Sequence, residues 1–180
     1  VELAQATWPD WWPELTPALT TAVTAPAAGP ARLAVSIWTQ LADLIVEDSK
    51  SFQRERKRKV TETLCGLLQQ PAESPTLIAC LEVTLRLHGS DMGVVRDVLS
   101  LLRALANAVP VKLLLHYGLD KIILSGIEVD ELRESAIEVL SAWVGKLGQE
   151  RLHPQPGDLC RLIAMLTQLS MRCIFNGSFE

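Results

Sequence analysis

The residues best suited to bind a charged ligand stand together at positions 54–59, where the sequence reads RERKRK. Five of them are cationic and one is anionic, so this run carries +4, although the whole chain carries −4. Clustered cations attract carboxylates and phosphates at close range. Arg54, Arg58 and Lys59 are therefore candidate contacts for an acidic peptide. Binding of nucleic acid or of a phosphorylated ligand through the same run is the alternative function.

Two further features bear on what the basic run does. The isoelectric point is near 5.4, and no second basic cluster or interleaved aromatic residues accompany the run. These features make nucleic acid an unfavourable partner. The run also has a purely structural interpretation, as the solvated first half of a helix whose long side chains lie along the margin of the core. Both interpretations stay open at the level of the sequence.

Catalytic and metal-binding chemistry finds few candidates in this chain. The three histidines lie far apart, at or near predicted helix ends, where a histidine commonly has a structural or solvent-facing role. The sequence has no glycine-rich phosphate loop, no GxSxG elbow and no HExxH motif. We therefore expect no enzyme activity, no cofactor and no metal. The four cysteines form no CxxC pair and fall in apolar helical patterns, which predicts reduced core thiols in a cytoplasmic or nuclear protein: Cys65, Cys80, Cys160 and Cys173.

Composition indicates a core built from aliphatic side chains. Hydrophobic residues make up 48% of the chain and aromatic residues only 5%, so Leu, Val, Ile and Ala must fill most of the interior. No apolar run approaches the roughly 20 residues of a membrane span, and no membrane partner is expected. The chain opens at Val1 with neither an initiator Met nor a signal peptide, so we expect a segment of a larger protein.

Apolar residues recur at steps of three and four through most of the chain, which predicts an all-α fold. We expect helices over about 17–23, 30–48, 51–69, 75–88, 92–108, 110–118, 119–125, 132–147 and 159–174. Ser90 or Asp91 should cap the helix at 92–108, and Gly126 should break the chain after 119–125. Three regions are expected: a Trp/Pro-rich entry segment at 1–29, a helical repeat domain at 30–176 and a tail at 177–180.

The inner positions of three predicted helices repeat. Val60, Leu64, Leu67 and Leu68 align with Val94, Val98, Leu101 and Leu102, and then with Ala136, Leu140, Trp143 and Val144. The offsets of 34 and 42 residues lie within the range of helical solenoids, in which each unit buries one face against its neighbours. In this arrangement, Trp143 should lie in the core between the last two units.

The stretch RESAIEVLSAWV at 133–144, preceded by a glycine, a short helix and an acidic turn, resembles the third helix of an armadillo unit. The chain from about 30 to 175 is similar to the HEAT and armadillo repeat superfamily. This resemblance implies a right-handed α-solenoid of about three to four units, working as a non-enzymatic protein–protein interaction scaffold. The entry segment looks like the Trp/Pro-rich helices of importin-β-type transport receptors; its residues Trp8, Trp11 and Trp12 either cap the core or anchor a partner.

The resemblance also suggests where a partner would bind. Armadillo proteins that bind basic peptides present a ladder of Trp and Asn on the third helix of each repeat. Here the Trp places are held by Glu62, Arg96 and Glu138, and the Asn places by Gly66, Ser100 and Ala142. The ladder is therefore absent, and we expect the groove along this face to bind another partner through Glu62, Arg96 and Glu138.

The predicted C-terminal helix carries an apolar stripe that includes Leu162, Leu166 and Leu169. In a solenoid each helix packs against a hairpin partner, and the sequence offers none to this one. A partner protein or a second copy of the chain is therefore expected to cover the stripe, making a homo-oligomer one of the expected assemblies.

Overall fold

The computed structural model describes residues 14–43, 52–69 and 77–149, together with residues 160, 163, 164 and 167. The ordered elements within the three long ranges are all helical, which confirms the all-α prediction. They are α2 (Leu15–Val23), α3 (Ala28–Asp43), α4 (Phe52–Gln69), α5 (Leu77–His88), α6 (Met92–Ala108), α7 (Val111–His116), α8 (Asp120–Glu128) and α9 (Asp130–Gln149). No helix among the described residues is long and apolar enough to cross a membrane.

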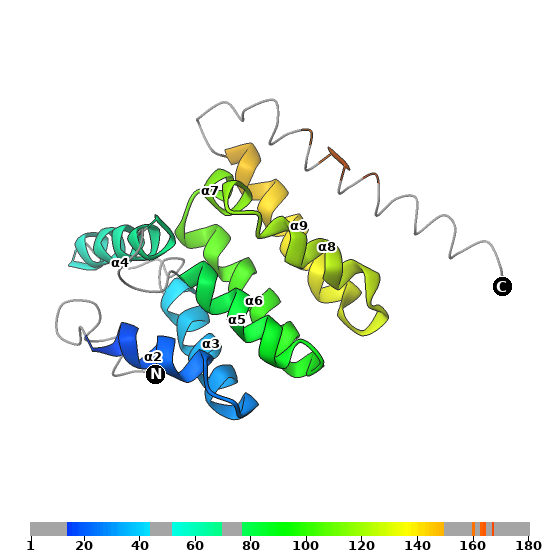
Figure 1. The fold of residues 1–180 in the computed structure, drawn as a ribbon. Coiled ribbons are helices and arrows are strands. Elements are labelled where there is room, and N and C mark those ends of the chain that lie inside the picture. Colours follow the sequence, from blue (N-terminus) through cyan, green and yellow to red (C-terminus); the bar gives the residue numbers. More distant parts are fainter. Residues whose placement is uncertain are drawn as a thin grey trace.

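The helices form two rows of three. In the inner row α3 packs against α6, and α6 packs against α9 (Figure 1). In the outer row α2 covers α3, α5 covers α6 and α8 covers α9. Each outer helix and the inner helix that follows it make a hairpin, so three hairpins stack in the order of the chain. This is the arrangement expected of HEAT-like repeats; the handedness of the solenoid stays a prediction.

The helix α4 belongs to neither of the two rows. It packs against α3 and α5 and has no place in the inner row, and Figure 1 shows it at one side of the stack. The alignment of residues 60–68 with residues 94–102 is therefore wrong, because α3 is the inner helix next to α6. An apolar stripe shows that one face is buried, as the side chains of Val60, Leu64 and Leu68 are, but it does not show which neighbour buries it.

The buried face of α3 combines small and large side chains. Leu33 is 61% exposed. The buried residues of this helix are Ala31, Ala34, Val35, Trp38, Leu41 and Ala42. Short side chains let two helix axes approach closely, so the three alanines suit the packing of α3 on α6. Val144 on α9 was expected inside as one of the repeating inner positions and is exposed.

Two glycines shape the third hairpin. Gly118 has a φ of 73°, a left-handed conformation that ends α7 where the sequence predicted. Gly126 does not break a helix, contrary to the sequence prediction, and lies inside α8. A Cβ atom there would lie 3.2 Å from the Cβ of Ala136 and 3.4 Å from Leu99 Cδ1. The glycine therefore serves a close approach between α8, α9 and α6.

Asp91 caps α6, as expected. Its Oδ1 accepts hydrogen bonds from the backbone N–H of Gly93 at 2.8 Å and of Val94 at 3.3 Å. Removing such a cap leaves helix donors without a partner, so Asp91→Ala should lower the free energy of unfolding by about 0.5–2 kcal/mol. Urea denaturation measures this loss, and Asp91→Asn, which can still accept, should restore most of it. An alanine variant as stable as the parent would contradict the capping role.

Several predictions fall outside the described residues. These are the placement of Trp8, Trp11 and Trp12, and the apolar stripe with Leu162, Leu166 and Leu169. The helix α2 lies within the expected entry segment and packs on α3. The division of the chain into three regions stays a prediction, as does the homo-oligomer.

Candidate functional site

The inner row carries a groove of about 520 Å³ that crosses all three of its helices. Its residues come from one helix after another: Thr39 and Asp43 from α3, then Leu99, Ser100, Arg103, Ala104 and Asn107 from α6, and Ser135, Glu138 and Val139 from α9. Polar and charged side chains make up more than half of this set. A groove built from three consecutive hairpins is where a repeat protein can hold an extended ligand.

Charged side chains cross the row near the N-terminal ends of α6 and α9. Arg32 Nε on α3 donates to Asp97 Oδ2 on α6 at 2.7 Å. The Arg96 guanidinium on α6 donates to the backbone carbonyl oxygen of Glu131 on α9 at 3.3 Å. We call these four residues the upper rung. Because these side chains are exposed to solvent, which screens their charges, the contacts contribute little to stability.

A second crossing, the lower rung, consists of Asp43, Arg103 and Glu138 and lies in the groove itself. Arg103 Nη1 on α6 donates to Glu138 Oε2 on α9 at 2.8 Å. On the other side of α6, the Asp43 side chain on α3 is exposed, but partial desolvation raises the pKa of its carboxyl group. The positive charge of Arg103 offsets part of this rise. The rung therefore brings two carboxylates to one guanidinium.

Two hydroxyl groups of the groove donate within their own helices. Thr39 Oγ1 donates to the carbonyl oxygen of Val35 at 2.9 Å, and Ser100 Oγ donates to that of Arg96 at 3.0 Å. Each of these hydroxyl oxygens keeps lone pairs that can accept a hydrogen bond. These two groups therefore present acceptors to a ligand, whereas Arg103 and Asn107 contribute donors to the same lining.

The structure brings together two of the residues that the sequence analysis selected. Arg96 belongs to the upper rung and Glu138 to the lower one, both exposed on the inner row. Glu62 lies apart from them on α4. Asp43 and Arg103 were not predicted from the sequence. Arg103 could have been found, because Arg96, Ser100, Arg103 and Asn107 follow one another at steps of four, three and four along one polar stripe of α6.

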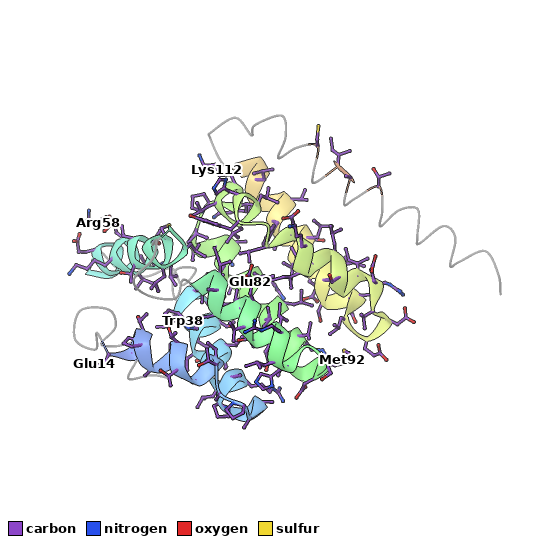
Figure 2. All side chains as sticks on the ribbon, viewed as in Figure 1. Glu14, Trp38, Arg58, Glu82, Met92 and Lys112 are labelled. Atoms are coloured by element: carbon purple, nitrogen blue, oxygen red, sulfur yellow. The ribbon has the colours of Figure 1, made fainter. Side chains whose placement is uncertain are left out.

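The basic run lies on α4, which packs against α3 and α5 but contributes no residue to the groove. Arg58 donates to Glu55 Oε1 at 2.8 Å and forms an ion pair with Glu62 at 3.4 Å, both within its own helix. Figure 2 shows Arg58 at the outer side of α4. Arg58 and Lys59, the predicted contacts for an acidic peptide, therefore lie outside the groove, since their helix does not line it. The side chain of Arg54 lies outside the described residues.

A second hollow, of about 320 Å³, lies between the outer helices α5 and α8. Its lining is almost entirely apolar, and Lys121 and Ser125 are the polar side chains that reach it. The groove of the inner row offers far more groups that could fix the orientation of a ligand. We therefore take the inner groove as the candidate site.

One histidine and two cysteines of the described residues lie in or against the core. His88 is buried, and its Nε2 lies 3.0 Å from the carbonyl oxygen of Ala25, which joins α5 to the end of α2. Burial raises the pKa of the Cys65 and Cys80 thiols, as predicted for core cysteines. Cys160 is exposed, so the prediction of a core thiol is wrong for this residue. The described residues contain no cluster of His, Cys, Asp and Glu that could hold a metal ion.

Comparison with known proteins places this architecture in a family. The model of the Exportin 1-like protein family matches residues 1–140. The chain belongs to this family. Exportin-like repeats are HEAT-type helical repeats, so the HEAT/armadillo resemblance is confirmed. No curated protein and no solved structure matches the chain.

The family match covers the candidate site of this exportin 1-like chain. The match begins ahead of α2 and ends within α9, so it includes the three hairpins up to Leu140. Every residue that lines the inner groove, from Thr39 to Val139, lies inside it. The groove is thus part of the exportin-like repeat region itself.

Proposed function

We propose that this exportin 1-like chain is a non-enzymatic interaction scaffold, an α-solenoid segment of a larger protein that binds a partner protein or peptide in the inner groove. One observation carries the proposal: a polar groove crosses three consecutive hairpins and is bordered by charged pairs that join neighbouring helices. Packed helices lie about 8–10 Å apart, so three of them span about 20 Å. That length corresponds to roughly six residues of an extended peptide.

The family supports the proposal in general terms. Its description names exportins, and transport proteins of this kind bind cargo or partner proteins. The same description agrees with a protein of the cytoplasm or the nucleus. The function proposed for the groove needs no catalytic group, cofactor or metal, since partner binding requires only complementary shape and charge.

The alternative function, binding of nucleic acid or of a phosphorylated ligand through residues 54–59, gains no support from the geometry. Arg58 shares its guanidinium between Glu55 and Glu62. A phosphate would have to compete with both carboxylates. We therefore propose the groove, and not the basic run, as the partner site.

A groove-blocking substitution tests the proposal. Ser100 is exposed on α6 and lines the groove, so Ser100→Trp should obstruct it without disturbing the core. Glu82 is exposed on the outer helix α5, and Glu82→Trp is the matched control. Proteins captured from cell extract by the tagged parent are identified by quantitative mass spectrometry. We expect Ser100→Trp to lose a defined subset of them, by tenfold or more, a loss of about 1.4 kcal/mol in binding.

The control variant should capture the same proteins as the parent. Far-ultraviolet circular dichroism and thermal melting verify that both variants are folded. If Ser100→Trp captures the full set of proteins while folded, the inner groove is not the partner site.

A further inference from the structure

We infer that the inner groove selects a cationic segment of its partner, with Asp43 as the carboxylate that receives a lysine or arginine side chain. This inference rests on the proposed function. It adds the sign of the ligand's charge and the residue that binds the charged side chain. It replaces the acidic partner expected from the sequence, because that expectation relied on the basic run at 54–59, whose helix does not line the groove.

The lower rung has two negatively charged side chains and one positively charged side chain. Arg103 donates to Glu138 at 2.8 Å, and this pair neutralises itself. Asp43 feels the charge of Arg103, but the structure gives it no ion pair within the described residues. The upper rung differs, since Arg32 holds Asp97 directly at 2.7 Å. A ligand in the groove therefore meets a surplus negative charge at Asp43, and a cation complements it.

The hydrogen-bonding groups point to the same ligand. The hydroxyl oxygens of Thr39 and Ser100 offer lone pairs to the groove, because their protons are bonded to carbonyl oxygens of their own helices. Both residues line the groove together with Asp43. The side chains of lysine and arginine carry only donors, three and five N–H groups respectively. They can therefore satisfy the Asp43 carboxylate and the two hydroxyl oxygens at once.

In the free protein the charged form of the Asp43 carboxyl group is unfavourable. The Asp43 side chain is exposed, but partial desolvation raises the pKa of its carboxyl group, which means that the folded state disfavours the charged form. A cation supplied by the partner relieves this effect. Binding energy is therefore available at this carboxylate that the free chain does not use.

The raised pKa also fixes the sign of a stability effect. A carboxyl group whose pKa is higher in the folded state favours folding when protonated, and this contribution is lost as the pH rises through the folded pKa. At neutral pH the charged Asp43 is therefore unfavourable for folding. Asp43→Asn removes the charge and should raise the melting temperature slightly, while it weakens binding of a cation.

Two labelled peptides test the inference on the full chain. One is a 12-residue peptide of alternating Lys and Ser, and the other has Glu in place of Lys; fluorescence anisotropy at low ionic strength measures both. We expect the basic peptide to bind and the acidic one not to. Asp43→Asn should weaken binding of the basic peptide by about tenfold, as loss of a charged hydrogen bond does. Glu62→Gln on α4 makes the same change of charge outside the groove and should alter it by less than about twofold.

The pH dependence gives a second readout. Binding of the basic peptide to the parent should weaken as the pH falls through the raised pKa of Asp43, and Asp43→Asn should lose that step. Equal weakening by Asp43→Asn and Glu62→Gln would overturn the inference, because it would show attraction to the net charge of the chain. Preference for the acidic peptide would also overturn it.

The outcomes separate this inference from the proposed function. If the parent binds neither peptide while Ser100→Trp still loses its captured proteins, the groove is the partner site but its ligand is not cationic. If the basic peptide binds through Asp43 while Ser100→Trp captures every protein, the cation site exists and the proposed function is wrong.

Discussion

Replacing Trp143 with alanine is expected to lower the free energy of unfolding by about 3–5 kcal/mol, the loss typical of large-to-small substitutions in a core. Trp143 on α9 is 0% exposed. Its indole N–H also donates to the carbonyl oxygen of Leu102 on α6 at 3.0 Å. The side chain thus joins two neighbouring inner helices both by packing and by a directed bond. Its removal should leave a cavity between the second and third hairpins.

Equilibrium unfolding in guanidinium chloride measures this loss, and Trp143→Phe separates its two parts. Phenylalanine fills much of the same space and cannot donate to Leu102, so this variant should lose clearly less stability than Trp143→Ala. Val144, the neighbouring residue, is exposed, and Val144→Ala should stay within about 0.5 kcal/mol of the parent. An alanine variant at 143 with the midpoint of the parent would show that the ring is not part of the core.

Local patterns were sufficient to predict the helices and some of their details. The cap at Asp91 and the end of α7 at Gly118 follow from the chemistry of one or two turns, and both are confirmed. The burial of Trp143 follows from its place in an apolar stripe. These features depend on residues close together in the sequence, where spacing translates directly into a shared face.

The spacing of apolar residues in a helix does not show which other helices pack against it. The stripe of α4 resembles that of α6 in its spacing, yet α3 is the neighbour of α6, and the buried face of α3 contains alanines among larger residues. The same error moved Glu62 into the expected groove. The lower rung joins Asp43, Arg103 and Glu138, which lie on three helices far apart in sequence, so only the packing of the inner row reveals it.

Gly126→Val is expected to lower the free energy of unfolding by about 1–3 kcal/mol, the usual cost of forcing extra atoms into a packed interior. Even the Cβ atom would lie 3.2 Å from the Cβ of Ala136, and the two γ-methyl groups need space beyond it. Gly145 on α9 is the matched control. It is exposed and has no atom within 4 Å of a built Cβ, so Gly145→Ala should stabilise the chain by about 0.5–1 kcal/mol through the higher helix propensity of alanine.

The two glycine variants also separate packing from binding. Ala136 lies two residues before Glu138, so α9 can yield to Gly126→Val only by shifting the segment that carries the Arg103–Glu138 pair. Affinity for the basic peptide should then change in Gly126→Val and stay at the parent value in Gly145→Ala, as measured by anisotropy on folded protein. Unchanged stability in Gly126→Val would contradict the close approach of α8 to α9. Lower stability with unchanged affinity would show that α8 supports the core and that the groove keeps its shape without it.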